Sequence, residues 1–457
     1  MQKALDHAES HFKESLEKLK ALSRIPSISF PGFDKDEVRR SAHAVHDLLK
    51  HEGLENVEIL EIPGTHPYVY ADWLHAEGKP TLLLYAHHDV QPPGRTERWK
   101  TEPFEPVEKD GRLYGRGTAD DKAGIIVHVA AISAYLKTSG SLPVNVKLLI
   151  EGEEEIGSEH LGLFLKTYQS KFKADAMVLT DTSNFDVGIP TITTSLRGLV
   201  VTEVTVKVMD HPLHSGSWGG PGPDPVIALS KMIASLVDDS GRIQIPGVYD
   251  NIRPLSAVER QSINQLGYTD KDFRKQAEIL PGVSLLGGDE NALVKMSRLP
   301  SISVNAIEAS SRKNKANIIN DSAWCKIGVR TVPDMDNAKI MKNLKAYIQS
   351  QAPWGVEISF GEETMAPWWV TEPKGKAFEL AHAALSEAFD KTCVYLGQGG
   401  TIPFIQPFSE VLGGVPALLI GVEDPYTNAH SENESVHIDD LRKSILGAIR
   451  FYHKMGL

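Results

Sequence analysis

Short apolar runs alternate with longer stretches of mixed polarity in the first 196 residues and again near the end of the chain. The stretches 122–136 and 158–168 place apolar residues three or four positions apart, which predicts amphipathic helices. The apolar runs are typical of buried strands and lie at 81–86, 144–150, 176–180 and 416–421. Strands that alternate with helices predict an α/β fold with a mixed, mostly parallel sheet.

The polarity pattern changes to strict alternation near Arg197. The segments LRGLVVTEVTVKVMD, SISVNAI and SAWCKIGVRTV place apolar residues at about every second position, which predicts half-exposed antiparallel strands. After VEISF, a joint that contains Pro and Trp leads into a predicted helix at 375–388 and then a buried strand. We therefore expect a smaller α+β domain at 197–364, inserted into a domain formed by 1–196 and 365–457.

Composition narrows the choice of partners. A chain of 457 residues, 41% of them apolar, is too long for one ordinary hydrophobic core. Its net charge of −12 disfavours nucleic acid and anionic membranes as binding partners. The start, MQKALDHAESHFKESLEKLKAL, has no continuous apolar segment and no small-residue cleavage site, so we expect a cytoplasmic protein. Cys325 and Cys393 show no CxxC spacing, so a metal site would need His and carboxylate ligands.

Metal-competent side chains follow each of the four apolar runs. TLLLYA runs into His87, and Asp89 lies two positions further on, so both side chains are expected on the same side of an extended chain. VNVKLLI runs into EGEEE, AMVLT into Asp181, and ALLIGVEDPYTNA into His430. Because open α/β sheets gather ligands at the carboxyl ends of their strands, we expect these groups to converge.

Each of these groups also has a purely structural interpretation. A lone His after a strand is more often a hydrogen-bonded structural residue, and the glutamates of EGEEE could form a solvated acidic turn. Asp120 and Asp121, within LYGRGTADDKAG, could cap the helix that follows them. The convergence of several strand ends favours a metal site over these alternatives.

Eight short sequence blocks occur in the same order along the chain as in a known protein family. They are YAHHDVQP, LYGRGTADDKAG, EGEEEIGS, VLTDT, LHSGSWGG, VRTVPDMD, GGTIPF and AHSENE. Over nearly its whole length the chain resembles the co-catalytic dinuclear zinc metallopeptidases, which include carnosinases, carboxypeptidase G, aminoacylases and succinyl-diaminopimelate desuccinylase. It is most similar to the carnosinase-type dipeptidase branch. The resemblance implies a catalytic domain from 1–196 and 365–457, with 197–364 as a lid and dimerisation domain.

The resemblance also implies the metal ligands and the reaction. Two divalent ions are expected per chain, with His87 and Asp181 on one, Glu155 and His430 on the other, and Asp120 bridging both. Such ligands suit Zn²⁺, with Mn²⁺ or Co²⁺ as substitutes.

In the implied reaction, a hydroxide between the ions attacks the amide bond of a dipeptide or short peptide with a free C-terminal carboxylate. Glu154 would act as the general base, and Asp89 would orient His87. The Asp120–Asp121 peptide is implied to be cis.

Substrate contacts are implied in and near the inserted domain. Arg330 would clamp the carboxylate, although a strand-end salt bridge is the alternative from the residues alone. His214 would stabilise the oxyanion from the other subunit of a homodimer, whereas a turn cap is its structural alternative. Gly397 stands where the family often has Arg. The implied contacts are completed by Asn305, Gly399, Gly400 and Thr401.

Other functions and assemblies remain open from the sequence. An N-acyl-amino-acid deacylase would use the same metal site with a different acyl pocket. A non-catalytic descendant of the family would not need Glu154, so its presence argues against that alternative. For the homodimer, the alternating strand at 199–208 is expected to offer an edge for pairing across a two-fold axis, although some family members are monomers.

Overall fold

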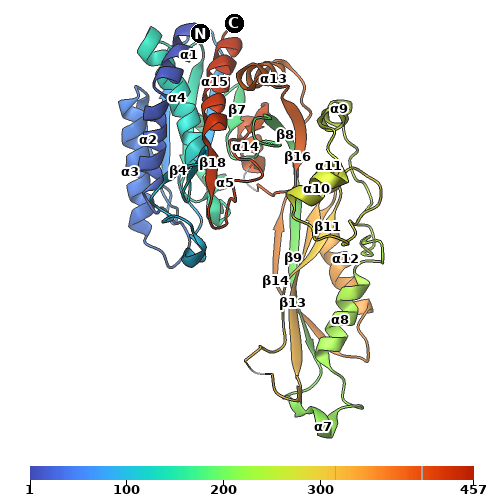
Figure 1. Cartoon of the computed structure of the whole chain (residues 1–457). Helices are drawn as coiled ribbons and strands as arrows, with labels where there is room; N and C mark the ends of the chain where they lie inside the picture. The colour runs from blue at the N-terminus through green and yellow to red at the C-terminus, as the bar shows by residue number, and fades with distance from the viewer. Residues whose placement is uncertain (314, 403–404) are drawn as a thin grey trace. The chain divides into compact units, whose positions relative to one another are not determined.

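The computed structural model describes residues 1–313, 315–402 and 405–457 (Figure 1). The chain forms two compact units. Unit 1 contains Met1–Thr194, Thr371–Leu396 and residues 405–457, and unit 2 contains Ser195–Val370 and residues 397–402. Unit 2 is thus inserted into unit 1, and its role as a lid or in dimerisation stays a prediction. None of the helices in the described ranges is both long enough and apolar enough to span a bilayer.

The larger sheet is mixed and has a parallel centre, with the strand order β1-β2-β6-β3-β7-β17-β8-β15 and β16 paired to β8. The parallel strands are β6 (Asn145–Glu151), β3 (Thr81–His87), β7 (Ala176–Leu179) and β17 (Ala417–Ile420). The remaining strands are β1 (Glu55–Leu60), β2 (Tyr68–Trp73), β8 (Thr191–Leu196), β15 (Trp369–Val370) and β16 (Val394–Gln398). The predicted α/β class is confirmed, and each of the four predicted apolar strands is present.

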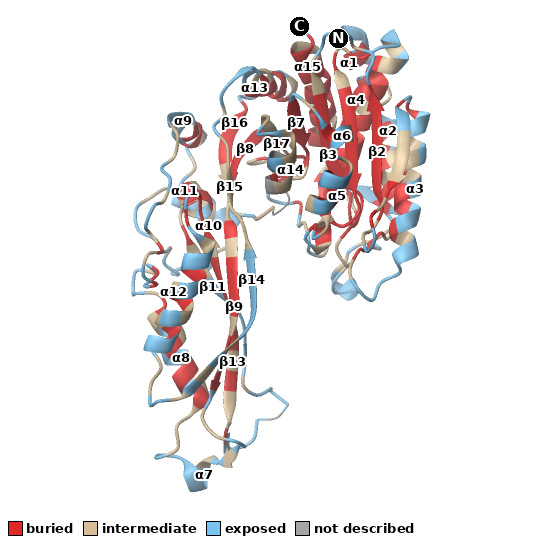
Figure 2. Cartoon of the chain, turned by 180° about the vertical axis from the view of Figure 1, so that it is seen from behind, coloured by how far each residue is buried: buried red, intermediate tan, exposed pale blue. Residues whose placement is uncertain are grey.

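Helix α4 (Lys122–Ser139) differs from the sequence prediction in the distribution of its apolar residues. Segment 122–136 is helical as predicted, but the helix is not amphipathic, because residues on nearly every side of it are buried (Figure 2). It packs against β3 and also against α1 (Gln2–Ser10), α2 (Phe12–Ser23) and α15 (Ile438–Met455). Up to Tyr135 the helix is almost wholly buried, and its apolar residues there need not form a stripe.

Shorter elements complete unit 1. The predicted helix 158–168 is observed as α5 (Leu161–Thr167), and 375–388 as α13 (Lys376–Phe389). A small sheet has the strand order β18-β5-β4. The other elements are α3 (Lys35–His51), η1 (Thr96–Arg98), β4 (Val107–Lys109), β5 (Arg112–Tyr114), η2 (Glu154–Ile156), α6 (Gln169–Phe172), α14 (Ile405–Leu412) and β18 (Ser435–His437).

Unit 2 is a four-stranded antiparallel sheet with helices packed against it. The strand order is β11 (Ser301–Glu308), β13 (Ser322–Thr331), β9 (Gly198–Lys207) and β14 (Glu357–Ala366). Buried apolar residues of β9 and β13 form one core with those of α8 (Pro225–Ser235) and α12 (Asn337–Ser350). The other elements are β10 (Leu213–His214), α7 (Ser215–Trp218), α9 (Ala257–Leu266), α10 (Asp270–Gln276), α11 (Ala292–Arg298) and β12 (Ile318–Ile319).

The position of β9 shows that one sequence prediction was wrong. The segment 199–208 was expected to offer a free edge, but β9 pairs with β13 on one side and with β14 on the other. The edges of this sheet are β11 and β14, and both strands are largely exposed (Figure 2). Alternating polarity shows which face of a strand is buried, whereas it carries no information about which edge is paired.

Candidate metal centre

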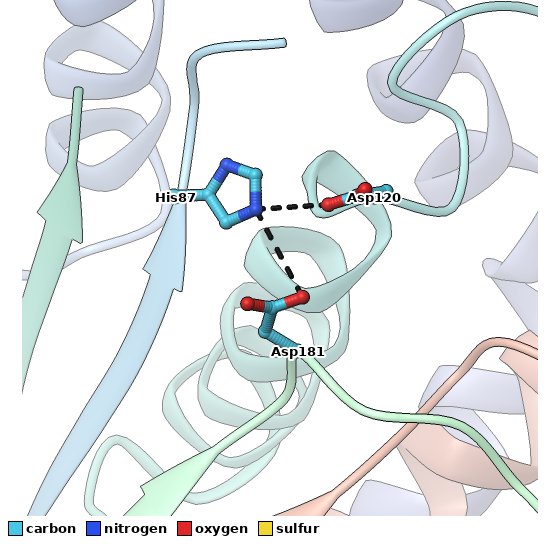
Figure 3. A group of neighbouring side chains, drawn as sticks. All are labelled: His87, Asp120 and Asp181. Carbon is cyan, nitrogen blue, oxygen red and sulfur yellow. Dashed lines mark hydrogen bonds and ion pairs between the residues drawn. The ribbon is translucent and has the colours of Figure 1, made fainter. Parts of the chain in front are cut away.

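Strand ends and loops of unit 1 bring the five predicted ligands together. His87 ends β3, Asp181 follows β7, and Asp120 lies just before α4 (Figure 3). The first ligand group consists of His87, Asp120 and Asp181, and the second consists of Asp120, Glu155 and His430. Within each group, one potential ligand atom per residue lies within 4.8 Å of the others.

Asp120 belongs to both groups, and its two carboxylate oxygens face different partners. Oδ1 lies 2.9 Å from Nε2 of His87, whereas Oδ2 lies 3.1 Å from Nε2 of His430. In Figure 3, the side chains of His87, Asp120 and Asp181 point toward one another from three separate segments. This is the arrangement that a carboxylate bridging two ions requires. The Asp120–Asp121 peptide is cis, as the resemblance implied.

Asp89 contacts both His87 and the turn that carries the glutamates. Nδ1 of His87 lies 3.1 Å from the backbone oxygen of Asp89 and 3.4 Å from its carboxylate Oδ1. The same carboxylate accepts hydrogen bonds from the backbone N–H groups of Glu154, at 3.2 Å, and Glu155, at 3.0 Å. Asp89 therefore joins the end of β3 to the glutamate turn, a contact that the HxD spacing alone does not predict.

The adjacent glutamates have different surroundings. Glu155 is buried, and its two oxygens accept hydrogen bonds from the backbone N–H of Gln91, at 3.0 Å, and from Nε2 of Gln91, at 2.7 Å. Glu154 belongs to neither ligand group, although its Oε2 lies 3.9 Å from Nε2 of His87. Sequence reasoning missed Gln91, whose position two residues after Asp89 in YAHHDVQP was the available signal.

The centre holds more carboxylates than its two imidazoles can neutralise. Burial raises the pKa of Glu154 to about 7 and raises the pKa values of Asp181 and Glu155 well above their ordinary range. For Asp120 burial acts in the same direction, but hydrogen bonds with His430 and His87 bring its pKa below the ordinary range. A group of buried carboxylates together with two imidazoles forms a donor set that fits divalent metal ions.

Arg330, at the end of β13, lies in a small cluster within unit 2. Its Nη1 donates a hydrogen bond to Oγ1 of Thr401, at 2.6 Å, and that hydroxyl donates to the backbone oxygen of Arg197, at 2.7 Å. Nε of Arg197 donates to the backbone oxygen of Gly399, at 3.1 Å. Among the described residues, no carboxylate forms an ion pair with either arginine, so the strand-end salt bridge considered for Arg330 is not observed.

Arg197 is a residue that sequence reasoning missed. Burial and the nearby charge of Arg330 lower its pKa to about 10. The two guanidinium groups therefore form a local excess of positive charge that suits an anion.

Gly397 lies in a crowded position. A Cβ atom there would lie 2.3 Å from Oγ of Ser195 and 2.9 Å from Cβ of Ser297, so any side chain at this position would require these two serines to shift.

His214 and Asn305 lie apart from the arginine cluster. His214 pairs with Ile318 before β13 begins, whereas Arg330 lies near the end of that strand. The exposed His214 ring caps α7, because its Nδ1 accepts hydrogen bonds from the backbone N–H groups of Gly216 and Ser217, at 3.1 and 3.2 Å. In the neutral ring Nε2 then carries the proton. Asn305 is exposed on β11, next to a shift in strand register.

Comparison with known proteins identifies the family. The model of peptidase family M20/M25/M40 matches residues 83–453. The chain belongs to this family of metallopeptidases. Its sequence is 33% identical to a cysteinylglycine-S-conjugate dipeptidase from Corynebacterium striatum, over 82% of this chain and 81% of that protein. The resemblance seen in the ordered blocks is therefore confirmed.

Solved structures of the same family share the fold. Human carnosine dipeptidase 1 superposes with a TM-score of 0.86 at 26% identity and covers 100% of this chain and 98% of its own. An M20 family metallo-carboxypeptidase from Sulfolobus solfataricus gives a TM-score of 0.81 at 28% identity, over 97% of this chain and 99% of its own. Both likenesses extend over nearly the full length of the chain.

Proposed function

We propose that this metallopeptidase hydrolyses the amide bond of dipeptides or short peptides that carry a free C-terminal carboxylate, with two divalent ions bound per chain. The observation that carries the proposal is the placement of Asp120, whose two oxygens face His87 and His430 in separate ligand groups. Relatives named as dipeptidases support the substrate class.

The donor set supports Zn²⁺, with Mn²⁺ and Co²⁺ as substitutes, because imidazole nitrogens and carboxylate oxygens suit all three ions. Two such ions would supply Lewis-acid chemistry, polarising the scissile carbonyl and lowering the pKa of a bound water. In this proposal His87 and Asp181 hold one ion, and Glu155 and His430 hold the other. Asp89 keeps the His87 ring in place through its contacts with Nδ1.

Glu154 is proposed as the general base. Its carboxylate lies beside the first ligand group without belonging to it, and its backbone N–H is held by Asp89. From this position the carboxylate takes a proton from the attacking water and passes it to the leaving nitrogen as the carbon–nitrogen bond breaks. Proton transfer of this kind typically contributes about 10²–10⁴-fold to the rate.

The arginine cluster of unit 2 is proposed to bind the substrate's C-terminal carboxylate. Arg330 supplies a guanidinium fork whose Nη1 is positioned by Thr401, and Arg197 adds a second cation beside it. Backbone groups of Gly399 and Gly400 and the amide of Asn305 complete the proposed substrate contacts. A site with two cations and no ion-pair partner among the residues that the structure describes disfavours substrates that lack a terminal carboxylate.

His214 is proposed to donate its Nε2 proton to the oxyanion, acting on the other subunit of a homodimer in the cytoplasm. Its Nδ1 already accepts two backbone hydrogen bonds, which leaves Nε2 as the donor.

A substrate panel tests the proposal against the deacylase alternative. Dipeptides, the same dipeptides with amidated C-termini, and N-acetyl amino acids would be offered to protein loaded with Zn²⁺, Mn²⁺ or Co²⁺. We expect turnover of free dipeptides and much weaker turnover of the amides. Faster hydrolysis of N-acetyl amino acids than of every dipeptide would replace the proposal with a deacylase. Full activity after the complete removal of metal would overturn both.

A further inference from the structure

Arg116 and Glu434 form an ion pair in the interior of unit 1. Nη1 of Arg116 lies 2.6 Å from Oε2 of Glu434, and the exposed fractions of the two side chains are 1% and 0%. Neither residue belongs to a ligand group. Burying two charges is costly unless both are well hydrogen-bonded, so their other contacts indicate what the pair holds in place.

Glu434 holds the chain segment that ends at the shared ligand. Its Oε1 accepts hydrogen bonds from the backbone N–H groups of Ala119, at 3.0 Å, and Asp120, at 3.2 Å. Its Oε2 accepts from the backbone N–H of Gly117, at 3.1 Å. One carboxylate therefore fixes the backbone path that presents Asp120.

Arg116 connects the same segment to two other loops. Its Nη2 donates to the backbone oxygens of Pro92 and Ser431, both at 3.1 Å. Ser431 directly follows the ligand His430. Pro92 directly follows Gln91, whose two donors hold the oxygens of Glu155. The guanidinium thus lies where the loops associated with Asp120, Glu155 and His430 meet.

We propose that the Arg116–Glu434 pair positions the loops of all three members of the second ligand group and, through Asp120, one member of the first, so that its loss weakens the binding of the second ion more than that of the first. This inference rests on the proposed two-ion function. The two other members of the first group are His87, which ends β3, and Asp181, which follows β7, and neither forms a hydrogen bond with Arg116 or Glu434. In the second group, by contrast, the side chain of His430 is 59% exposed, so its position depends on the loop that carries it.

The test is a Zn²⁺ titration of metal-depleted protein, followed by calorimetry. Glu434→Gln keeps the shape of the side chain but removes its charge and one of its two acceptor oxygens. We expect two sites in the wild type and, in Glu434→Gln, an affinity about 10–100-fold lower at one site, with a smaller loss at the other because Asp120 belongs to both groups. The matched control is Glu52→Gln, which removes a buried carboxylate that is bound to Lys18 and Lys137 instead of a ligand loop. The control should keep both affinities.

A second variant covers the case in which Glu434→Gln does not fold, as judged by circular dichroism. Arg116→Lys keeps a cation for Glu434, but a single ammonium cannot reproduce the planar fork that reaches Pro92 and Ser431, so the same site should weaken. Two sites with unchanged affinities in the folded variants, or equal losses at both sites, would overturn the inference while leaving the proposed function intact. Fewer than two ions in the wild type would overturn the proposed function and this inference with it.

Discussion

Oδ2 of Asp120 lies 3.1 Å from Nε2 of His430, a residue from a distant part of the sequence. The other oxygen of the same carboxylate faces His87 at 2.9 Å. One short side chain therefore connects two groups of potential ligands, and each group has a further carboxylate of its own, Asp181 or Glu155. Substitutions in these residues should consequently have unequal effects on metal content.

Asp120→Ala should release both ions, because both ligand groups lose a member. Asp181→Ala should release only one, since Asp181 belongs to the first group alone. Elemental analysis after dialysis against a weak chelator would measure the difference as ions per chain. Equal metal content in the two variants would contradict the bridging role of Asp120.

The variants Glu154→Gln and Glu155→Gln should show which of the two glutamates is the general base and which is a metal ligand. Glu154 lies outside both ligand groups, so Glu154→Gln should keep the metal content while the turnover rate falls by about 10²–10⁴-fold or more. Glu155→Gln should lose metal, because Glu155 belongs to the second group. Metal content and single-turnover rates would be measured on the same preparations. Equal metal loss in both variants would show that the two roles are wrongly assigned.

The sequence allowed prediction of those parts of the site in which a potential ligand comes at or directly after the end of a strand. The apolar runs before His87 and Asp181 indicated parallel strands, and the carboxyl ends of parallel strands meet at one edge of a sheet. Contacts between distant loops were not predictable in this way. Arg116 and Glu434 meet through tertiary packing, and neither residue lies in a periodic segment whose pattern could reveal its partner.

The same limit applies to unit 2. Alternating polarity located β9, yet its place between β13 and β14 depends on strand pairing that the pattern does not encode. Arg197 was missed for a related reason, because its partner Arg330 becomes a neighbour only when β9 and β13 align.

Arg330→Met and Arg197→Met should raise KM for free dipeptides by about 10–100-fold, since a charge-assisted hydrogen bond contributes about 1.5–3 kcal/mol. The same variants should change KM little for dipeptides with an amidated C-terminus, which lack the negative charge. The matched control is Arg260→Met, which removes another arginine of unit 2 whose partner Glu290 is half-exposed. Equal effects on free and amidated substrates would contradict a role in carboxylate binding.

Glu52 should make the stability of the protein depend on pH at a site remote from the proposed ligands. Burial opposes the charge of this carboxylate, but Lys18, Ser133, His51 and Lys137 donate hydrogen bonds that lower its pKa from 4.5 to about 2. Because the folded pKa lies below the unfolded value, the stabilisation is present above about pH 4.5 and is lost as the pH falls toward 2.

Glu52→Gln should therefore lower the free energy of unfolding by about 2 kcal/mol at pH 7, and the difference from wild type should shrink below about pH 4.5. Urea unfolding of both proteins at a series of pH values would measure this difference in the free energy of unfolding. Glu61→Gln, which removes the half-buried partner of the exposed Arg39, should have little effect at any pH. A deficit for Glu52→Gln that stays constant down to pH 3 would contradict the assigned shift.

His214 should be required on the opposite subunit of a homodimer. It lies on an exposed turn of unit 2, and its Nε2 is left as a donor by the two hydrogen bonds that Nδ1 accepts. His214→Ala and Glu154→Gln should each be nearly inactive alone. After subunit exchange, a mixed dimer would combine the intact Glu154 of one chain with the intact His214 of its partner at one of its two sites. Activity should therefore return to about half the wild-type value per mixed dimer.

Sedimentation and differently tagged chains would establish that exchange has occurred. If exchanged mixtures stay inactive, or if the wild type is fully active as a monomer at working concentration, His214 does not act across a subunit interface.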